Sequence, residues 1–196
     1  MKDLFIATNN KHKLEEINAI FKINNFNINI LTPRDFDDYS DPIEDGFTYE
    51  ENAYIKASYY FNKYHLPTIA DDSGLSIKYF NNLPNLHSKR FLYGKNNDET
   101  NEFIVEVMKY VKDREAIFES VICFIDENSN INYFSGNNIG EIAYEIKGNE
   151  GFGYDPILYI PYMKKTEAEL GNDFKNHYSH RAKAIKRFIN FVKENY

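Results

Sequence analysis

The sequence predicts a mixed α/β domain built on a central β-sheet, and two observations carry this prediction. Near the N-terminus, the apolar run Leu4–Thr8 is followed by an amphipathic helical pattern over Lys11–Phe21, a strand–loop–helix opening common in α/β proteins. In the middle of the chain, Ile117–Ile125 and Ile131–Gly136 flank a turn at Glu127–Asn130, which predicts a β-hairpin. Alternating strands and helices followed by antiparallel strands are typical of a mixed sheet flanked by helices.

The remaining stretches continue this alternation. An acidic loop is expected over Pro33–Gly46, and Thr48 is expected to cap a helix running to about Tyr64, with Glu51 as its capping-box partner. Further strands are expected at Asn27–Leu31, Thr68–Ala70, Leu75–Phe80, Ile139–Ile146 and Pro156–Ile160, and further helices at Asp98–Val111 and Ser179–Glu194. The 196 residues are enough for a single domain with a buried core, which we expect to span residues 1–196.

Composition and charge indicate an ordinary soluble globular protein. Hydrophobic residues make up 42% and charged residues 27% of the chain, and its net charge is -7. A duplex-binding protein usually carries a basic stripe, and none is obvious here, so we expect no nucleic-acid partner. No apolar run reaches the length of a membrane span, and the N-terminus lacks the long apolar region of a signal peptide.

The cysteine count and the missing motifs narrow the chemistry. The single cysteine, Cys123, lies in the apolar run Val121–Ile125, which predicts a buried core thiol and fits a cytoplasmic, reducing compartment. No G-x-x-x-x-G-K-[ST], no G-x-G-x-x-G after a strand, no H-E-x-x-H and no Cys/His cluster occurs. P-loop NTPases and zinc hydrolases are therefore excluded.

The first candidate site segment, Thr8-Asn9-Asn10-Lys11-His12-Lys13, lies where a strand passes into a helix. Loop amides and a helix N-terminus form a natural anion site there. Thr8 and Asn10 are candidates to hydrogen-bond phosphate oxygens, and Lys13 reaches them from the first turn. The alternative is a plain helix cap with exposed lysines, which spacing alone favours.

The second candidate is Asp71-Asp72-Ser73-Gly74, at the expected end of a strand. Two adjacent carboxylates suit Mg²⁺, which prefers oxygen ligands. Because side chains alternate along a strand, one carboxylate is expected to face a cleft and the other to anchor the loop. The alternative is an ordinary acidic turn.

The third candidate is the segment Gly148–Pro156, which reads Gly-Asn-Glu-Gly-Phe-Gly-Tyr-Asp-Pro. Gly153 and the glycine two positions earlier allow close approach of the backbone. Phe152 and Tyr154 offer flat faces on which a base can stack, and Asp155 is a candidate to hold the loop or to accept from a base N–H. The alternative is a β-turn with two core aromatic rings.

The fourth candidate runs from Lys175 to Ser179-His180-Arg181. Ser179 is expected to cap a helix, which places His180 and Arg181 in the first turn, beside the positive end of the helix dipole. Cations in this unfavourable place suggest an anionic or carbonyl-bearing partner, such as a phosphate or a purine O6. The alternative is a solvated helix start.

Taken together, these segments resemble the ITP/XTP pyrophosphatase family, which removes deaminated purine nucleotides. The resemblance spans almost the whole chain, and six blocks occur in the family's order. The blocks are Ala7-Thr8-Asn9-Asn10 with Lys13, Gly46-Phe47-Thr48-Tyr49-Glu50-Glu51-Asn52-Ala53 with Lys56-Ala57, Ala70-Asp71-Asp72-Ser73-Gly74-Leu75, Ser88 with Arg90-Phe91, Gly151-Phe152-Gly153-Tyr154-Asp155-Pro156, and Ser179-His180-Arg181-Ala182. The wording of these blocks is similar to the bacterial branch of the family.

The resemblance implies an elongated α/β fold with a long central mixed sheet, an active-site cleft between two lobes, a homodimer, and Mg²⁺ as cofactor. It also implies roles for individual residues. Thr8, Asn9, Asn10 and Lys13 would bind phosphate, Lys56 would face the triphosphate, Asp72 would be general base and metal ligand, Ser73 would contact substrate, Phe152, Gly153, Tyr154 and Asp155 would form the base-binding loop, and Lys175, His180 and Arg181 would close over base and phosphate.

The chain departs from the family pattern at two places. The family often has a second metal-binding glutamate in the acidic loop, where Ile43 stands in this chain, so Glu44 is the candidate for that ligand. A Pro-Gly pair usually precedes the serine of another block, and here it reads Pro84-Asn85. Asparagine tolerates a left-handed conformation, so a turn is still expected there.

The predicted activity is therefore Mg²⁺-dependent hydrolysis of ITP, dITP or XTP to the monophosphate and pyrophosphate, by attack of activated water at the α-phosphate. A related pyrimidine enzyme acting on dTTP or UTP is one alternative, and a nucleotide-binding sensor without catalysis is another. A hydrolase triad of Ser73, His180 and Asp72 is disfavoured, because adjacent Asp and Ser on one tight loop give poor triad geometry.

Overall fold

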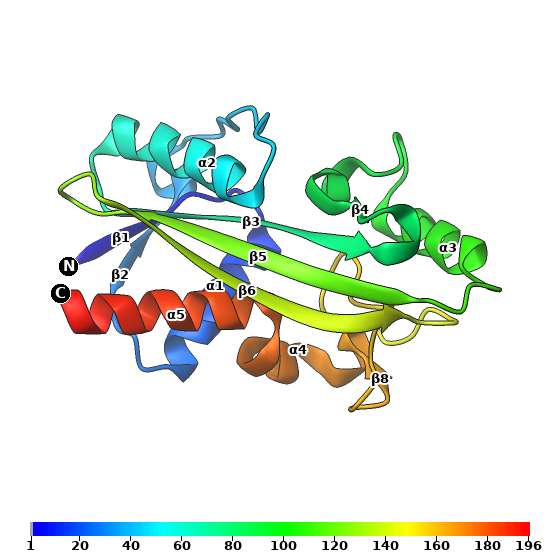
Figure 1. The fold of residues 1–196 in the computed structure, drawn as a ribbon. Coiled ribbons are helices and arrows are strands. Elements are labelled where there is room, and N and C mark those ends of the chain that lie inside the picture. Colours follow the sequence, from blue (N-terminus) through cyan, green and yellow to red (C-terminus); the bar gives the residue numbers. More distant parts are fainter. Residues whose placement is uncertain (1) are drawn as a thin grey trace. The chain divides into compact units, whose positions relative to one another are not determined.

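The computed structural model describes residues 2–196, without the side chains of residues 89 and 90. The chain, expected as one domain, divides by its internal contacts into two compact units. Unit 1 comprises residues 1–72, 120–136 and 181–196, and unit 2 comprises residues 73–119 and 137–180. An eight-stranded mixed sheet has the strand order β2-β1-β3-β5-β6-β7-β8, with β4 paired to β3 (Figure 1). The predicted mixed α/β fold is confirmed.

Unit 1 is a layered α/β arrangement around the first strands. Its elements are β1 (Asp3–Ile6), α1 (Lys11–Ile23), β2 (Asn29–Leu31), a 3-10 turn η1 (Pro33–Phe36), α2 (Tyr49–Tyr64), the first part of β3 (Thr68–Ile77), the ends of β5 and β6 that meet at their hairpin, and α5 (His180–Asn195) from Arg181 on. β1 pairs in parallel with β2 and with β3. Helix α2 lies on one face of β1, and α1 and α5 lie on the other (Figure 1). Because side chains alternate along β1, Leu4 packs with α1 and α5, whereas Phe5 packs with α2.

Unit 2 has its own core. Its elements are the second part of β3, η2 (Lys78–Phe80), β4 (Leu83–Pro84), η3 (Asn85–Arg90), α3 (Asn97–Val107), the remaining parts of β5 (Glu115–Ile125) and β6 (Ile131–Ile142), β7 (Leu158–Ile160), β8 (Lys165–Thr166) and α4 (Glu167–Tyr178). The antiparallel pairs β6–β7 and β7–β8 bring the start of α4 to the end of the sheet. Leu75, Ile104, Ile142 and Leu158 are among its buried core residues.

Three element predictions need correction. The motif Asp71-Asp72-Ser73-Gly74 does not end a strand, because β3 runs without a break over Thr68–Ile77. The strand expected at Ile139–Ile146 is the end of β6, which stops at Ile142. Helix α4 was not predicted, because Gly171 interrupts its pattern with a non-helical φ of 79°.

The unbroken strand β3 has a physical requirement. A buried strand tolerates two aspartates, here Asp71 and Asp72, only when partners compensate their charge, and the sequence alone does not show those partners.

One expectation about a single residue is confirmed. Cys123 is fully buried, and burial raises the pKa of its thiol to about 12, which makes it a core residue rather than a nucleophile. Among the described residues, no helix is both long and apolar enough to cross a membrane.

A buried arginine donates hydrogen bonds to backbone carbonyls at the ends of two elements of unit 2. Arg114 donates through Nε to the carbonyl of Ile142 at 2.5 Å and through Nη2 to the carbonyl of Ala143 at 2.7 Å. Its Nη1 donates to the carbonyl of Met108, at the end of α3. The Tyr144 ring lies over the guanidinium at 4.1 Å. One side chain therefore satisfies carbonyls at the ends of α3 and β6.

We expect Arg114→Met to lower the free energy of unfolding by about 3 kcal/mol, because it leaves buried carbonyls without a donor. Urea denaturation measures this loss. Arg187→Met is the control, because Arg187 is exposed and donates to the Ser135 carbonyl at the surface, and we expect a loss below about 1 kcal/mol. Equal losses for the two variants would contradict this role of Arg114.

Candidate active site

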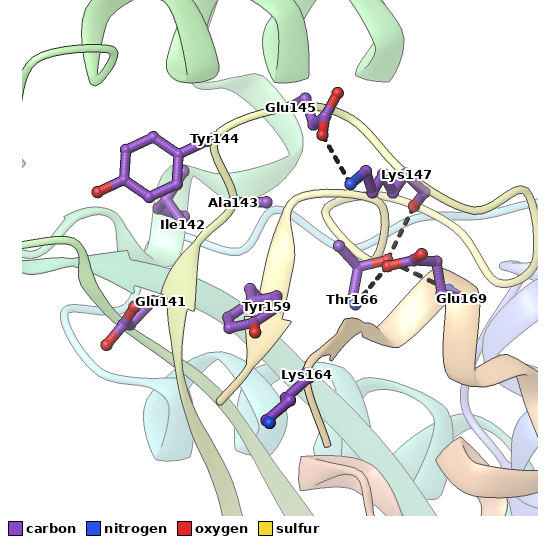
Figure 2. Close-up of a pocket in the computed structure, with 10 residues that line it drawn as sticks. All are labelled: Glu141, Ile142, Ala143, Tyr144, Glu145, Lys147, Tyr159, Lys164, Thr166 and Glu169. Carbon is purple, nitrogen blue, oxygen red and sulfur yellow. Dashed lines mark hydrogen bonds and ion pairs between the residues drawn. The ribbon is translucent and has the colours of Figure 1, made fainter. Parts of the chain in front are cut away.

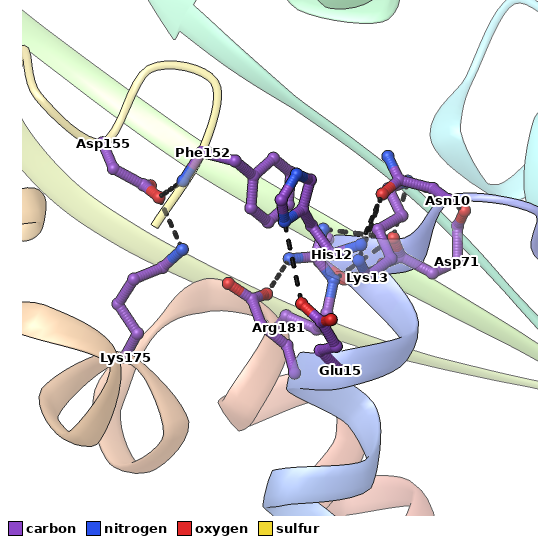
Figure 3. Close-up of polar contacts among 11 residues, drawn as sticks. Asn10, His12, Lys13, Glu15, Asp71, Phe152, Asp155, Lys175 and Arg181 are labelled. Carbon is purple, nitrogen blue, oxygen red and sulfur yellow. Dashed lines mark hydrogen bonds and ion pairs between the residues drawn. The ribbon is translucent and has the colours of Figure 1, made fainter. Parts of the chain in front are cut away.

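The carboxylate of Asp71 is the centre of a buried charge network in unit 1. Its Oδ2 lies 2.7 Å from Nζ of Lys13 and 3.2 Å from Nη2 of Arg181 (Figure 3). Its Oδ1 accepts a hydrogen bond of 2.5 Å from Oγ of Ser120. Arg181 also pairs with the carboxylate of Glu16 on α1. Although burial opposes ionisation, Arg181 and Lys13 hold the pKa of Asp71 well below its ordinary value.

The next residue, Asp72, lies in a different environment. Its side chain is 9% exposed, and its Oδ2 has no hydrogen-bond partner among the described residues. Burial raises the pKa of Asp72, Lys13 and Lys56 counteract this rise, and Glu44 adds to it. A buried carboxylate oxygen without a donor fits a cation ligand or a proton acceptor.

Glu44 and Lys56 lie close to Asp72. Nζ of Lys56 is 3.0 Å from Oε1 of Glu44 and donates to the carbonyl of Asp71 at 3.3 Å. Glu44 is near enough to Asp72 to influence its pKa, whereas the side chain of Ile43 is 82% exposed. This arrangement supports Glu44 as the second carboxylate near Asp72. The role of Glu44 as a metal ligand stays a prediction.

The first candidate segment forms a helix cap. Asn10 is the N-cap of α1, and its Oδ1 accepts from the amides of His12 at 3.0 Å and Lys13 at 3.2 Å. Thr8 Oγ1 accepts from the amide of Asn10, and Asn9 Nδ2 donates to the carbonyl of Ser40 at 3.1 Å. The capping alternative therefore describes Asn10, and phosphate binding by this segment stays a prediction.

Lys13 differs from the solvated surface lysine that spacing alone favours. Its side chain is 16% exposed, and Nζ also donates to the carbonyl of Asp71 at 3.3 Å. Burial lowers the pKa of Lys13, although Asp71 acts in the opposite direction. Lys13 and Lys56 therefore donate to the same backbone oxygen, and both ammonium groups lie next to Asp71 and Asp72.

In unit 2, Asp155 shapes the glycine-rich loop. Its Oδ2 accepts from the amide of Phe152 at 2.6 Å and from Nζ of Lys175 at 2.6 Å (Figure 3). A Cβ on Gly151, which has φ +80°, would lie 2.1 Å from Oδ2 of Asp155, so this position requires glycine. The carbonyl of Gly153 accepts from Asn101 Nδ2 at 2.9 Å. The predicted loop-holding role of Asp155 is thus seen in the structure.

The expectation that both aromatic rings of this loop can stack on a base needs correction for Tyr154. Its ring is buried in the core of unit 2, and its hydroxyl donates to the carbonyl of Ser88 at 2.7 Å. Phe152 is only partly buried, and Nζ of Lys175 lies 4.8 Å from the centre of its ring. Phe152 therefore keeps the stacking role as a prediction, and Tyr154 is a core residue.

The candidate residues of the fourth segment, Lys175, Ser179, His180 and Arg181, are buried rather than solvated. His180 stacks on Phe118 in unit 2, with ring centres 4.3 Å apart and planes at 10°. Lys175 is 1% exposed and pairs with Asp155. The anionic partners expected for Arg181 include Asp71 and Glu16 of this same chain.

Several residues of these networks were missed from sequence. Glu16 had one available signal, because it stands beside Ile17 on the apolar face of α1. Ser120 had none, since a single polar residue inside a strand is ordinary. Figure 2 shows a further pocket of unit 2, with a volume of about 290 Å³, lined by Tyr144, Tyr159 and Lys164 among others. None of the predicted site residues lines that pocket.

Comparisons with known proteins identify the family to which the chain belongs. The sequence model of the Ham1 family matches residues 4–191. A dITP/XTP pyrophosphatase of Clostridium perfringens is 39% identical over 98% of both chains, and one of Staphylococcus epidermidis is 39% identical over 94% of this chain and 93% of that one.

Solved structures of related proteins have the same fold. The Ham1 protein of Staphylococcus aureus superimposes with a TM-score of 0.88 at 32% identity, with 100% of each chain covered. A HAM1 protein of Coxiella burnetii has a TM-score of 0.88 at 34% identity, covering 99% of this chain and 100% of that one. The family predicted from the six sequence blocks is confirmed, and the chain belongs to the Ham1 family.

Proposed function

We propose that this chain hydrolyses deaminated purine nucleoside triphosphates, namely ITP, dITP and XTP, to the monophosphate and pyrophosphate, with Mg²⁺ as cofactor. The relatives named dITP/XTP pyrophosphatase supply the substrate class. The observation that carries the chemistry is the buried carboxylate of Asp72, whose Oδ2 has no donor among the described residues and which lies close to Lys13, Lys56 and Glu44.

We assign the triphosphate to residues of unit 1. Lys13 and Lys56 would offset the negative charge of the phosphate chain and of the leaving pyrophosphate. The amides at the start of α1, with Thr8, Asn9 and Asn10, would contact phosphate oxygens. Arg181, predicted to contact substrate, is assigned a supporting role, because its buried guanidinium already pairs with Asp71 and Glu16.

The donors present fit a hard divalent cation. Asp72 has an unpartnered buried oxygen, Glu44 lies close by, and both supply the oxygen ligands that Mg²⁺ prefers. When bound, Mg²⁺ would neutralise phosphate charge and polarise the phosphate oxygens. Asp72 would accept the proton of the water that attacks the α-phosphorus. Among the described residues, no group of three or more His, Cys, Asp or Glu side chains could hold a metal ion by itself.

We assign the nucleobase to residues of unit 2. Phe152 would stack on the base, and Ser73, Gly153, Lys175 and His180 would supply polar contacts, with Asp155 keeping the loop in shape. Donors aimed at a 6-oxo group accept hypoxanthine and xanthine, whereas adenine carries an amino group there and would leave those donors unpaired. This is the physical basis for discrimination against adenine nucleotides.

The proposal also includes the homodimer and the cytoplasmic location that the sequence suggests. Its ligand is a small-molecule nucleotide, and it includes no nucleic-acid partner. Light scattering of the purified chain measures its oligomeric state. A monomer at all concentrations would remove the homodimer from the proposal and leave the reaction unaffected.

A substrate panel tests the reaction. With dITP, XTP, dGTP, dATP, dTTP and UTP, we expect Mg²⁺-dependent release of pyrophosphate and monophosphate from dITP and XTP, at least about tenfold faster than from dGTP and dATP. Ion-exchange chromatography identifies the nucleotide product. Faster turnover of dTTP or UTP would assign the pyrimidine activity, a diphosphate product would place attack at the γ-phosphorus, and tight binding without turnover would indicate a sensor.

Asp72→Asn tests the proposed base. We expect kcat for dITP to fall by about a thousandfold, because the amide cannot accept the proton of water, with an unchanged circular dichroism spectrum. Asp173→Asn is the control, since the Asp173 side chain is 98% exposed, and it should leave kcat unchanged. Activity retained in the Asp72 variant would remove this residue from the mechanism.

The two aromatic rings of the loop are expected to respond differently to substitution. Phe152→Ala should raise KM for dITP by about 5-fold to 100-fold, because a base loses its stacking surface. Tyr154→Phe should leave KM unchanged and lower the free energy of unfolding by about 1 kcal/mol through loss of the hydrogen bond to Ser88. A raised KM in Tyr154→Phe would show that the Tyr154 hydroxyl contributes to substrate binding, because phenylalanine keeps the aromatic ring.

A further inference from the structure

A buried glutamate that no sequence motif includes lies at the start of α4. Glu167 is the first residue of this helix, and its side chain has 0% exposure. Asn138 Nδ2 donates to its Oε1 at 2.5 Å, whereas its Oε2 meets no donor among the described residues. An ionised carboxylate in this position would keep an uncompensated buried charge, which is costly.

The neighbours of Glu167 are the groups that shape the base-binding loop. The amide of Ala168, the next residue, donates to the carbonyl of Asp155 at 3.1 Å. Asp155 pairs with Lys175, and both side chains are 2% exposed. Burial, followed by the carboxylate of Asp155, raises the pKa of Glu167 to about 8, while Lys175 and Asn138 act in the opposite direction.

The charges of Glu167, Asp155 and Lys175 do not cancel when all three side chains are ionised. Two carboxylates, Glu167 and Asp155, would then share one ammonium, that of Lys175. Two other acidic side chains near this helix start accept from backbone amides: Glu169 from that of Thr166 and Glu150 from that of Asn172. Lys147 pairs with Glu145 at 2.6 Å. A proton on Glu167 balances the charge of these three side chains.

We propose that Glu167 is a positioning residue that acts as a neutral acid, donating its proton to the carboxylate of Asp155 so that Asp155 stays bonded to Lys175 and to the amide of Phe152. This inference rests on the proposed function, in which the loop of Asp155 receives the nucleobase. The neutral acid adds a donor to Asp155 without adding charge. The loop that presents Phe152 therefore depends on the protonation of a residue outside it.

Loss of the proton changes these contacts. The Glu167 carboxylate repels Asp155 and competes with it for Lys175, so the loop loses the contacts that fix the Phe152 backbone. Base binding then weakens as the pH rises through about 8. The proposed chemistry at Asp72 belongs to unit 1, so KM should change more than kcat.

The test measures kcat and KM for dITP from about pH 6 to about pH 10 for the full chain, Glu167→Gln and Glu169→Gln. For the unmodified chain we expect KM to rise by up to about tenfold per pH unit above about 8, with little change in kcat. In Glu167→Gln, whose amide donates a hydrogen bond without titrating, this rise should be absent. Glu169→Gln removes an exposed charge from the same helix turn and should keep the rise.

Two measurements detect the protonation of Glu167 in the absence of substrate. The side-chain carboxyl carbon of Glu167, assigned by its absence in Glu167→Gln, should titrate in the NMR spectrum with a midpoint near 8. The folded chain binds this proton more tightly than the unfolded chain does. Thermal stability should therefore fall as the pH rises from the ordinary glutamate range toward 8, and this fall should be smaller in Glu167→Gln. Asn138→Ala should move the NMR midpoint upward, because it removes a donor to the charged form.

The outcomes separate this inference from the proposed function. A Glu167 carboxyl that titrates in the ordinary glutamate range would overturn the inference whatever the kinetics show. A midpoint near 8 with the same pH dependence of KM in Glu167→Gln and the unmodified chain would overturn the positioning role alone. Absence of turnover with every triphosphate would overturn the proposed function and the positioning role with it, while the NMR midpoint would still decide whether Glu167 holds a proton.

Discussion

The ion pairs of Asp71 are the interaction on which the architecture of unit 1 depends. One buried carboxylate on β3 receives Lys13 from α1, Arg181 from α5 and the hydroxyl of Ser120 from β5. Four elements that are far apart in sequence are thereby joined at one point. Removing one partner of such a network leaves the others as buried charges and costs about 3 to 5 kcal/mol. The network also leaves Asp72, the next residue, without these cations as direct partners.

The two units share a charge pattern and differ in how it is completed. In unit 1, Asp71, Asp72, Glu16 and Glu44 face Lys13, Lys56 and Arg181, which leaves one negative charge in excess among these described residues. In unit 2, Asp155 and Glu167 face Lys175, again with one in excess. Asp72 is slightly exposed and can receive a cation, whereas Glu167 is fully buried and is balanced by a proton.

Sequence reasoning predicted the mixed α/β fold, most of its longer elements and the candidate site residues, because these depend on local pattern and on motif spacing. It did not find their partners. Asp71 and Asp72 look equivalent in the sequence, and only the cations that arrive from α1 and α5 distinguish them. Tyr154 and Phe152 look equally suited to stacking, and packing against the core of unit 2 separates them. Long-range contacts of this kind have no local signal.

The position of the two lysines of unit 1 bears on which ligand they can bind. Lys13 and Lys56 both donate to the carbonyl of Asp71 at 3.3 Å, so their ammonium groups are fixed before any substrate arrives. Such preorganised charges stabilise developing negative charge without reorganising during the reaction. Each lysine also has a carboxylate partner, Asp71 or Glu44, with which a ligand must compete. In the proposed function, a triphosphate carries enough charge to compete with those carboxylates, whereas a monophosphate carries less. The ion pairs that orient the lysines would therefore favour release of the monophosphate product.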